Sequence, residues 1–338
     1  MSVNPTGRPN PPPNPAWLAR RVEEAIEPDL PIIDAHHHLY DVAHPRYMLD
    51  EILADTRSGH RIEATVFVEA KVMFRKDGPE EFRTVGEVEV ANGIAAMAAT
   101  GLYGPTRLCA AIVSHADLCM GDRIDPLLDA LERAGGGRFR GVRHNVAQDE
   151  DVRKVAPPGL LRDADFQRGF ARLQARGHRF DAWLYHPQID DLVELMRAFP
   201  ESRVVLNHVG GRIGIGRFAG RDAETFADWK RDLAKLTAFP NLTVKVGGLG
   251  MFFTGYGFDQ RPEPPSSDEL TAAWSDTMRT VIDMFGPNRC MFESNFPVDK
   301  IAASYAVTWN AFKKISRGYS AEERQRLFYG TAADFYAI

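Results

Sequence analysis

Between Pro31 and Asp41 the chain reads Pro-Ile-Ile-Asp-Ala-His-His-His-Leu-Tyr-Asp, a short apolar run that ends in three histidines. Successive side chains of an extended strand alternate between two faces, so His36 and His38 share one face and His37 lies on the other. Two imidazoles at one strand end are typical of a metal site, or of a site that places two proton carriers on a substrate. A His-rich surface turn is the alternative for this segment alone.

Seven further strand-like runs follow, with helix-like segments between them. Eight strands that alternate with helices predict an α/β fold, a closed parallel (β/α)8 TIM barrel, whose active site lies at the carboxyl ends of the strands. The seven runs are Ala64–Glu69, Arg107–Val113, Arg138–His144, Phe180–His186, Arg203–His208, Leu242–Val246 and Arg289–Asn295.

The domain organisation follows from length and composition. A chain of 338 residues with 44% hydrophobic content can bury one large core, which we place in a barrel over residues 31–338. Residues 1–30 are predicted to form an N-terminal arm and a leading helix. The arm, Met1–Pro15, is rich in Pro and Asn, and the helix, Ala16–Ile26, would close the bottom of the barrel.

The net charge and the cysteine spacing limit which partners and which cellular compartment the sequence favours. A net charge of −5 without a basic tract argues against nucleic acid and membrane surfaces and favours a small-molecule substrate. Cys109, Cys119 and Cys290 have neither zinc-finger nor disulfide-framework spacing, so we expect free thiols in a reducing, cytoplasmic compartment. The sequence leaves open whether the chain forms a homo-oligomer.

Four motifs occur at strand ends in a fixed order: Asp34-x-His36-x-His38, Asn207–Gly210, Val244–Leu249 and Phe292–Pro297. Together they resemble the amidohydrolase superfamily, and more narrowly its amidohydrolase-2 branch of sugar lactonases, pyrone-dicarboxylate lactonase and related decarboxylases. The resemblance runs from about Pro31 to Ile338. It implies a distorted (β/α)8 barrel and hydrolysis of a carbon–oxygen bond in a small acid or lactone.

One position departs from the resemblance. The family usually carries an aspartate on the eighth strand as metal ligand and base, and this chain has Asn295 there. An amide cannot accept a proton at neutral pH and is a poor metal ligand beside a carboxylate. Glu293, Asp299 and Glu69 are the candidate replacements. We rank Glu293 first because a carboxylate buried in a barrel should be charge-paired or functional.

The remaining site residues follow from their places at strand ends. We expect His36, His38 and His186 to ligate a divalent metal, zinc or manganese, with weak occupancy because Asn295 replaces the usual aspartate. His208 joins the catalytic set with Glu293, Asn295 and Asp299. For Glu293 the alternative is a structural ion pair with Lys245 or Arg143. The predicted substrate-binding residues are Arg143, His144, Glu69, Lys71 and Arg46.

Several alternatives stay open at these positions. Arg143 and His144 would point to opposite faces of a regular strand, so only one of them should look inward. Surface solvation is the alternative for Lys71 and Arg46. The glycine- and aromatic-rich segment Gly247–Gly257 is either a lid at the barrel mouth or a packed surface loop.

The predicted reaction is attack of water on a strained ester carbonyl, assisted by the histidines and a carboxylate, in a hydrolase of small, carboxylate-bearing lactones. A second enzymatic hypothesis is non-oxidative decarboxylation of an aromatic acid. Asn295 argues against it, because that reaction would normally need an aspartate and a tightly bound metal at this place. A catalytically inactive barrel used for binding is the third.

Overall fold

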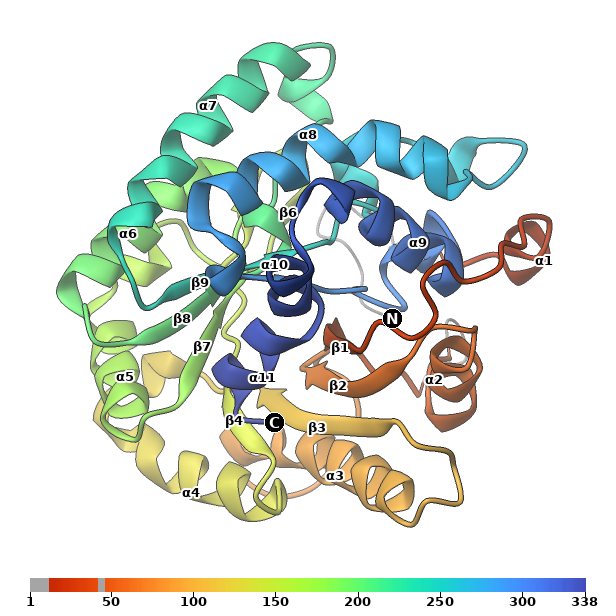
Figure 1. The fold of residues 1–338 in the computed structure, drawn as a ribbon. Coiled ribbons are helices and arrows are strands. Elements are labelled where there is room, and N and C mark those ends of the chain that lie inside the picture. The colour runs from red at the N-terminus through yellow and green to blue at the C-terminus, as the bar shows by residue number, and fades with distance from the viewer. Residues whose placement is uncertain (1–11, 42–45) are drawn as a thin grey trace.

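The computed structural model describes residues 12–41 and 46–338 and contains a barrel of parallel strands wrapped by helices (Figure 1). The strands are hydrogen-bonded in the order β1-β2-β3-β4-β7-β8-β9-β10. This order confirms the predicted (β/α)8 barrel. The strands are β1 (Ile32–His37), β2 (Ile62–Val68), β3 (Arg107–Ser114), β4 (Phe139–Val142), β7 (Arg179–Ala182), β8 (Arg203–Leu206), β9 (Leu242–Val246) and β10 (Cys290–Phe292).

The barrel closes where the chain beyond β10 meets β1. The backbone N–H of His38 donates to the carbonyl of Phe296 over 2.8 Å, and that of Asn295 donates to the carbonyl of His36 over 2.9 Å. These bonds bring the first and fourth predicted motifs, which end the first and eighth strands, together at the carboxyl ends of the strands.

The longer helices cover the outside of the barrel and bury apolar faces against the strands. Most follow a strand directly, as the predicted alternation requires. They are α2 (Leu49–Thr56), α3 (Val85–Ala99), α4 (Asp125–Ala134), α5 (Ala164–Ala175), α6 (Ile189–Ala198), α7 (Asp222–Ala234), α8 (Ser267–Phe285) and α9 (Tyr305–Ile315).

The C-terminal helices α10 (Ala321–Gln325) and α11 (Thr331–Tyr336) lie across the middle of the ring of strands (Figure 1). The inside of the barrel forms its own apolar cluster, in which alanines of β1 to β3 leave room for larger side chains. Phe335 and Tyr336 of α11 fill that room. The C-terminus therefore closes the interior.

The N-terminal prediction is wrong beyond the first turn. Helix α1 spans only Pro15–Leu18, whereas a helix was expected over Ala16–Ile26. The later backbone is held by tertiary contacts instead, since Lys313 on α9 donates to the carbonyls of Ile26 (2.9 Å) and Glu27 (2.7 Å). The Ile26 N–H, which would donate within a helix, donates instead to the Asn310 side chain on α9 over 2.9 Å. Most of the predicted arm, residues 1–11, lies outside the described residues.

A short hairpin after β4 was not predicted. Its strands β5 (Gln148–Asp149) and β6 (Arg153–Lys154) pair antiparallel. Two-residue strands carry too little alternation to be recognised in a sequence. Within residues 12–41 and 46–338, no helix is both long and apolar enough to cross a lipid bilayer.

Candidate active site

The end of β1 places its histidines as the period of two predicts. His36 and His38 meet through their Nε2 atoms, 3.2 Å apart, while Nε2 of His37 lies 2.9 Å from the Thr65 hydroxyl on the other face. Nδ1 of His38 lies 2.9 Å from the Val68 carbonyl oxygen. Because a carbonyl only accepts, this Nδ1 carries the proton, and Nε2 of His38 presents a lone pair toward His36.

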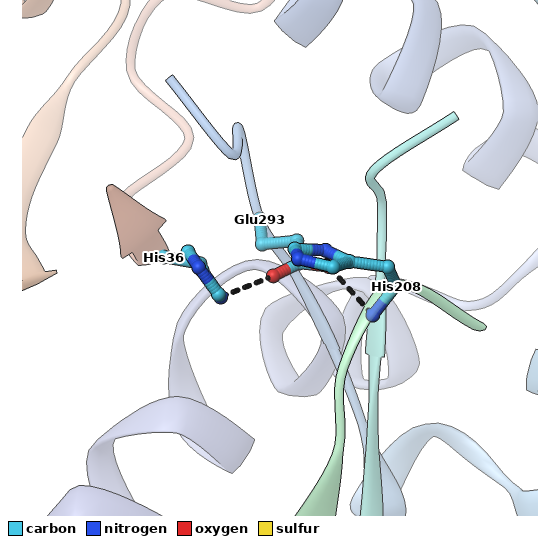
Figure 2. Close-up of side chains that lie close together, drawn as sticks. All are labelled: His36, His208 and Glu293. Atoms are coloured by element: carbon cyan, nitrogen blue, oxygen red, sulfur yellow. Dashed lines mark hydrogen bonds and ion pairs between the residues drawn. The ribbon is translucent and has the colours of Figure 1, made fainter. Parts of the chain in front are cut away.

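Glu293 lies between His36 and His208 (Figure 2). Its Oε1 accepts from the backbone N–H of His208 over 3.1 Å and lies 2.7 Å from Nδ1 of the same residue. Its Oε2 lies 3.0 Å from Nδ1 of His36, at an angle that does not satisfy a hydrogen bond. The carboxylate is fully buried, so one of its oxygens is committed to His208 and the other is left facing His36.

Arg143 reaches the same place from the end of β4. Its Nε donates to Glu69 Oε1 over 2.7 Å, and its Nη1 lies 3.3 Å from Nε2 of His36. His144 turns the other way, where its Nδ1 accepts from the backbone N–H of Leu118 over 3.2 Å. Of these two neighbours, Arg143 is the one that looks inward, as strand alternation requires.

A buried ion pair under the site was missed in the sequence. Nζ of Lys245 donates to Asp181 over 2.7 Å and lies 3.2 Å from Nδ1 of His36. Asn207 donates to the same Asp181 oxygen over 3.1 Å. The available signal was a charged residue inside each apolar strand run, because such residues are almost never buried without a partner. Their pairing joins β7 to β9 past the strand between them, β8.

Asn295 and Asp299 form a separate contact above the strands. Asn295 has a φ of 54°, a left-handed conformation that asparagine tolerates better than most residues, and its Nδ2 donates to Asp299 over 2.7 Å. The other Asp299 oxygen accepts from the Gly250 N–H over 2.8 Å. Asp299 thus ties the loop after β9 to the motif of β10.

Three predicted residues make their contacts elsewhere. Nδ1 of His186 accepts from the backbone N–H of Ile213 over 3.2 Å. Lys71 is solvent-exposed, with a φ of 58°, and Arg46 forms an ion pair with Glu51. In the part of the chain that the structure describes, no hydrogen bond or ion pair joins these three to the cluster around Glu293.

Burial sets the charge state of the cluster. It holds the pKa values of His36, His38 and His208 well below 6.5, so all three are neutral imidazoles at neutral pH. Burial also raises the pKa of Glu293 to about 8, and the pKa of Asp299 to about 8. The site therefore combines proton acceptors with a carboxyl group that titrates near neutrality.

The donor set fits a divalent metal. His36, His208 and Glu293 each offer a ligand atom, and these atoms lie within 4.8 Å of one another. Neutral imidazoles and a carboxylate are ligands that zinc accepts. The buried Oε2 of Glu293, which has no hydrogen-bond partner among the described residues, is an open donor for such an ion.

A second group of potential ligands, Asp117, Cys119 and His144, lies outside this cluster. Its atoms already have partners, because Asp117 accepts from the Cys119 N–H over 3.0 Å and His144 from the Leu118 N–H over 3.2 Å. These bonds belong to the turn after β3, so the group caps that turn.

An apolar wall flanks His208. The Trp183 ring lies 4.6 Å from the His208 ring and 5.9 Å from the ring of Phe253. Phe253 belongs to the predicted lid segment, and it packs against Tyr185 at 5.1 Å. The segment after β9 is therefore packed against the aromatic residues beside His208.

Comparisons with known proteins identify the family. An amidohydrolase family model matches residues 33–338. An L-fucono-1,5-lactonase from Burkholderia multivorans is 32% identical over 230 residues, which cover 68% of this chain and 72% of that protein. An uncharacterised protein from Sinorhizobium fredii is 31% identical over 335 residues, 92% of this chain and 99% of that protein. A zinc-bound amidohydrolase structure from Burkholderia multivorans aligns with a TM-score of 0.71 at 26% identity, over 91% of this chain and 99% of that one. The chain therefore belongs to the amidohydrolase family.

Proposed function

We propose that this protein hydrolyses a small lactone by attack of water on the ester carbonyl. The observation that carries the proposal is the buried Glu293 carboxylate, which has one oxygen bonded to His208 and the other open beside His36. The similarity to a lactonase supports the same reaction class. A carboxylate at this place can take a proton from water while the neighbouring groups hold the carbonyl.

The reaction adds water to the carbonyl carbon and then expels the ring oxygen. Glu293 Oε2 accepts a proton from water as the water oxygen bonds to that carbon, and the carbonyl oxygen becomes an oxyanion. The Arg143 guanidinium, 3.3 Å from Nε2 of His36, stabilises the developing negative charge. The oxyanion then re-forms the carbonyl as the ring carbon–oxygen bond breaks, and the ring oxygen leaves as an alkoxide. The proton on Glu293 returns to the leaving alkoxide, and the product is a hydroxy acid.

A metal ion has a defined place in this proposal. His36, His208 and Glu293 would hold it, with His38 as a further neighbouring imidazole. Glu293 Oε2 would then ligate the ion, so it acts as the base only in the metal-free protein. When bound, zinc or manganese polarises a carbonyl or lowers the pKa of a coordinated water. We propose that occupancy is weak, because Asn295 turns its amide to Asp299 and supplies no carboxylate.

The site walls favour a ring-shaped substrate with an apolar face. Trp183 and Phe253, packed beside His208, are aromatic side chains of the kind that stack on sugar or pyrone rings. Lys71 and Arg46 remain the proposed partners of a substrate carboxylate at the mouth.

The test is a screen of sugar lactones, muconolactones and pyrone dicarboxylates with a pH-indicator readout, run beside Glu293→Gln. Acid release by the wild type that the variant lacks would support the proposal. Carbon dioxide release from an aromatic acid, without turnover of any lactone, would support the decarboxylase reading instead. Neither activity would point to a binding module.

A further inference from the structure

The C-terminal helix is clamped to the barrel by arginines from three neighbouring strands. Helix ends leave carbonyl groups without intrahelical partners, and a cationic side chain satisfies them and complements the helix dipole. Here each of the last residues of α11 has one such donor. The bonds are Arg140 Nε to Tyr336 O (2.6 Å), Arg179 Nε to Phe335 O (2.7 Å) and Arg203 Nη2 to Asp334 O (3.2 Å).

This clamp places the Tyr336 side chain inside the barrel. The side chain is fully buried, and its hydroxyl lies 3.0 and 3.1 Å from the two oxygens of Asp181, to which it donates. The Lys245 ammonium lies 5.2 Å from the centre of the Tyr336 ring, within the range of a cation–π contact. A residue near the chain end thus contacts both members of the ion pair under the active site.

Asp181 links Tyr336 to His36 through Lys245. Besides the Tyr336 hydroxyl, its carboxylate accepts from Asn207 and from Lys245. A buried carboxylate keeps its place only while its hydrogen bonds are satisfied. Loss of one donor would let Asp181 move, and the Lys245 ammonium, which it holds 3.2 Å from Nδ1 of His36, would move with it.

The position of Lys245 bears on which nitrogen of His36 carries the proton. An ammonium group only donates, so Lys245 favours the tautomer with a lone pair on Nδ1 and a proton on Nε2. That Nε2–H points to the lone pair of His38, 3.2 Å away. Two groups favour the opposite tautomer, with the proton on Nδ1 and a lone pair on Nε2: Glu293 Oε2, 3.0 Å from Nδ1, and Arg143 Nη1, a donor 3.3 Å from Nε2. The place of Lys245 therefore bears on the balance between the two tautomers.

We propose that Tyr336 is a positioning residue of the active site: the C-terminal helix delivers its hydroxyl to Asp181, which fixes Lys245 against Nδ1 of His36. The part of this proposal that concerns turnover rests on the proposed lactone hydrolysis. The part that concerns His36 does not.

The direct test is nitrogen NMR of the full chain labelled with ¹⁵N-histidine, because the two ring nitrogens of each tautomer resonate at different shifts. The His36 signals are assigned by their loss in His36→Gln. Tyr336→Phe removes the hydroxyl and keeps the ring, and should shift both His36 signals. Tyr329→Phe is the matched control, since its hydroxyl has no hydrogen-bond partner among the described residues, and should leave them unchanged.

The second readout is kinetic. With a lactone that the wild type turns over, Tyr336→Phe should lower kcat by about 3- to 30-fold and leave KM unchanged, because Tyr336 does not touch the substrate. Tyr329→Phe should change neither. If the wild type turns over no lactone, the proposed function fails, while the NMR measurement still decides the role of Tyr336.

Unchanged His36 signals in a folded Tyr336→Phe, with a melting temperature near that of the wild type, would overturn the proposal. Should that variant fail to fold, Arg140→Gln loosens the clamp at the Tyr336 carbonyl and leaves the hydroxyl in place. A smaller shift of the same His36 signals is then expected. Its absence overturns the proposal equally.

Discussion

At the scale of single residues, the chemistry depends on which carboxylate has a free oxygen. Both Asp299 oxygens are bonded, one to Gly250 and one to Asn295, whereas Glu293 has an open Oε2 beside His36. A carboxylate oxygen that already accepts hydrogen bonds is less available to take a proton from water than an open one. This difference favours Glu293 as the base.

Glu293→Gln keeps the side-chain volume and removes the basic oxygen. We expect kcat to fall by about 10²- to 10⁴-fold, as for loss of a general base, with a smaller effect on KM. Asp299→Asn, the matched control, should be mild. Initial-rate kinetics of both variants check this. A dead Asp299→Asn beside a nearly normal Glu293→Gln would transfer the base to the loop after β10.

Asn295→Asp supplies the carboxylate that the resemblance implies at this position. We expect tighter metal binding, because the new carboxylate adds a ligand near Glu293, and a raised pKa for the coupled carboxyl groups. Competition against a chelator measures the affinity of both proteins for zinc. Wild-type protein should hold less than one ion per chain after chelator dialysis. One tightly held ion in the wild type would contradict the proposed weak occupancy.

Residue patterns predicted the first members of the site and missed the others. Strand alternation placed His36 and His38 on one face, and the Asn207–Gly210 and Phe292–Pro297 motifs pointed to His208 and Glu293. The Asp181 contacts could not be read in this way. They join β7 to β9 and to the last helix, and only the closed barrel brings those segments together.

At the scale of elements, the strands were predictable because each is a compact apolar run bounded by polar residues. Observed bounds differ from the predicted runs by a few residues, and β9 has the predicted bounds, Leu242–Val246. The helix expected over Ala16–Ile26 failed for a different reason. Helical spacing is a local signal, and the contacts of that segment with α9 override it.

The end of β9 depends on glycine. A Cβ on Gly247 would lie 2.4 Å from the carbonyl oxygen and 2.5 Å from Cγ of Glu293. Gly247→Ala should therefore displace Glu293, lowering the free energy of unfolding by about 1 to 3 kcal/mol, as overpacking does, and lowering kcat as well.

The control for Gly247→Ala is Gly93→Ala within α3. Nothing lies within 4 Å of the added methyl group there. This substitution should raise the free energy of unfolding by about 0.5 to 1 kcal/mol, because alanine replaces a glycine inside a helix. Urea unfolding of both variants measures the difference. A Gly247→Ala protein as stable and as active as the wild type would show that β9 has room to move.

At the scale of the whole molecule, the two ends of the barrel have different contents. The carboxyl ends of the strands hold the histidine and carboxylate cluster, and the interior below it is filled from the C-terminal helix. The Asp181–Lys245 ion pair lies between this cluster and the C-terminal helix, so it contacts both the site and the packed interior. Substitutions in this ion pair should therefore affect both activity and stability, whereas substitutions on the outer helices should affect stability alone.

The same burial makes the fold sensitive to acid. Several histidines away from solvent have pKa values that burial lowers to about 4, among them His60, which is 5% exposed. Nε2 of His60 donates to the Ala306 carbonyl over 3.1 Å, and Nδ1 accepts from Lys313 over 2.9 Å. A proton on Nδ1 would break the second bond. The folded state therefore binds fewer protons than the unfolded state between pH 6.5 and about 4.

Stability linked to His60 is therefore present above pH 6.5 and is lost as the pH falls toward 4, by about 2 kcal/mol at pH 5. His60→Gln keeps a donor and an acceptor at this place and does not titrate. Between pH 7 and pH 5 the free energy of unfolding should fall in both proteins. The fall should be about 2 kcal/mol smaller in the variant than in the wild type. Urea unfolding at both pH values measures the two falls. Equal falls in the two proteins would mean that His60 is protonated in the folded protein at pH 5, and that Lys313 moves away from its Nδ1.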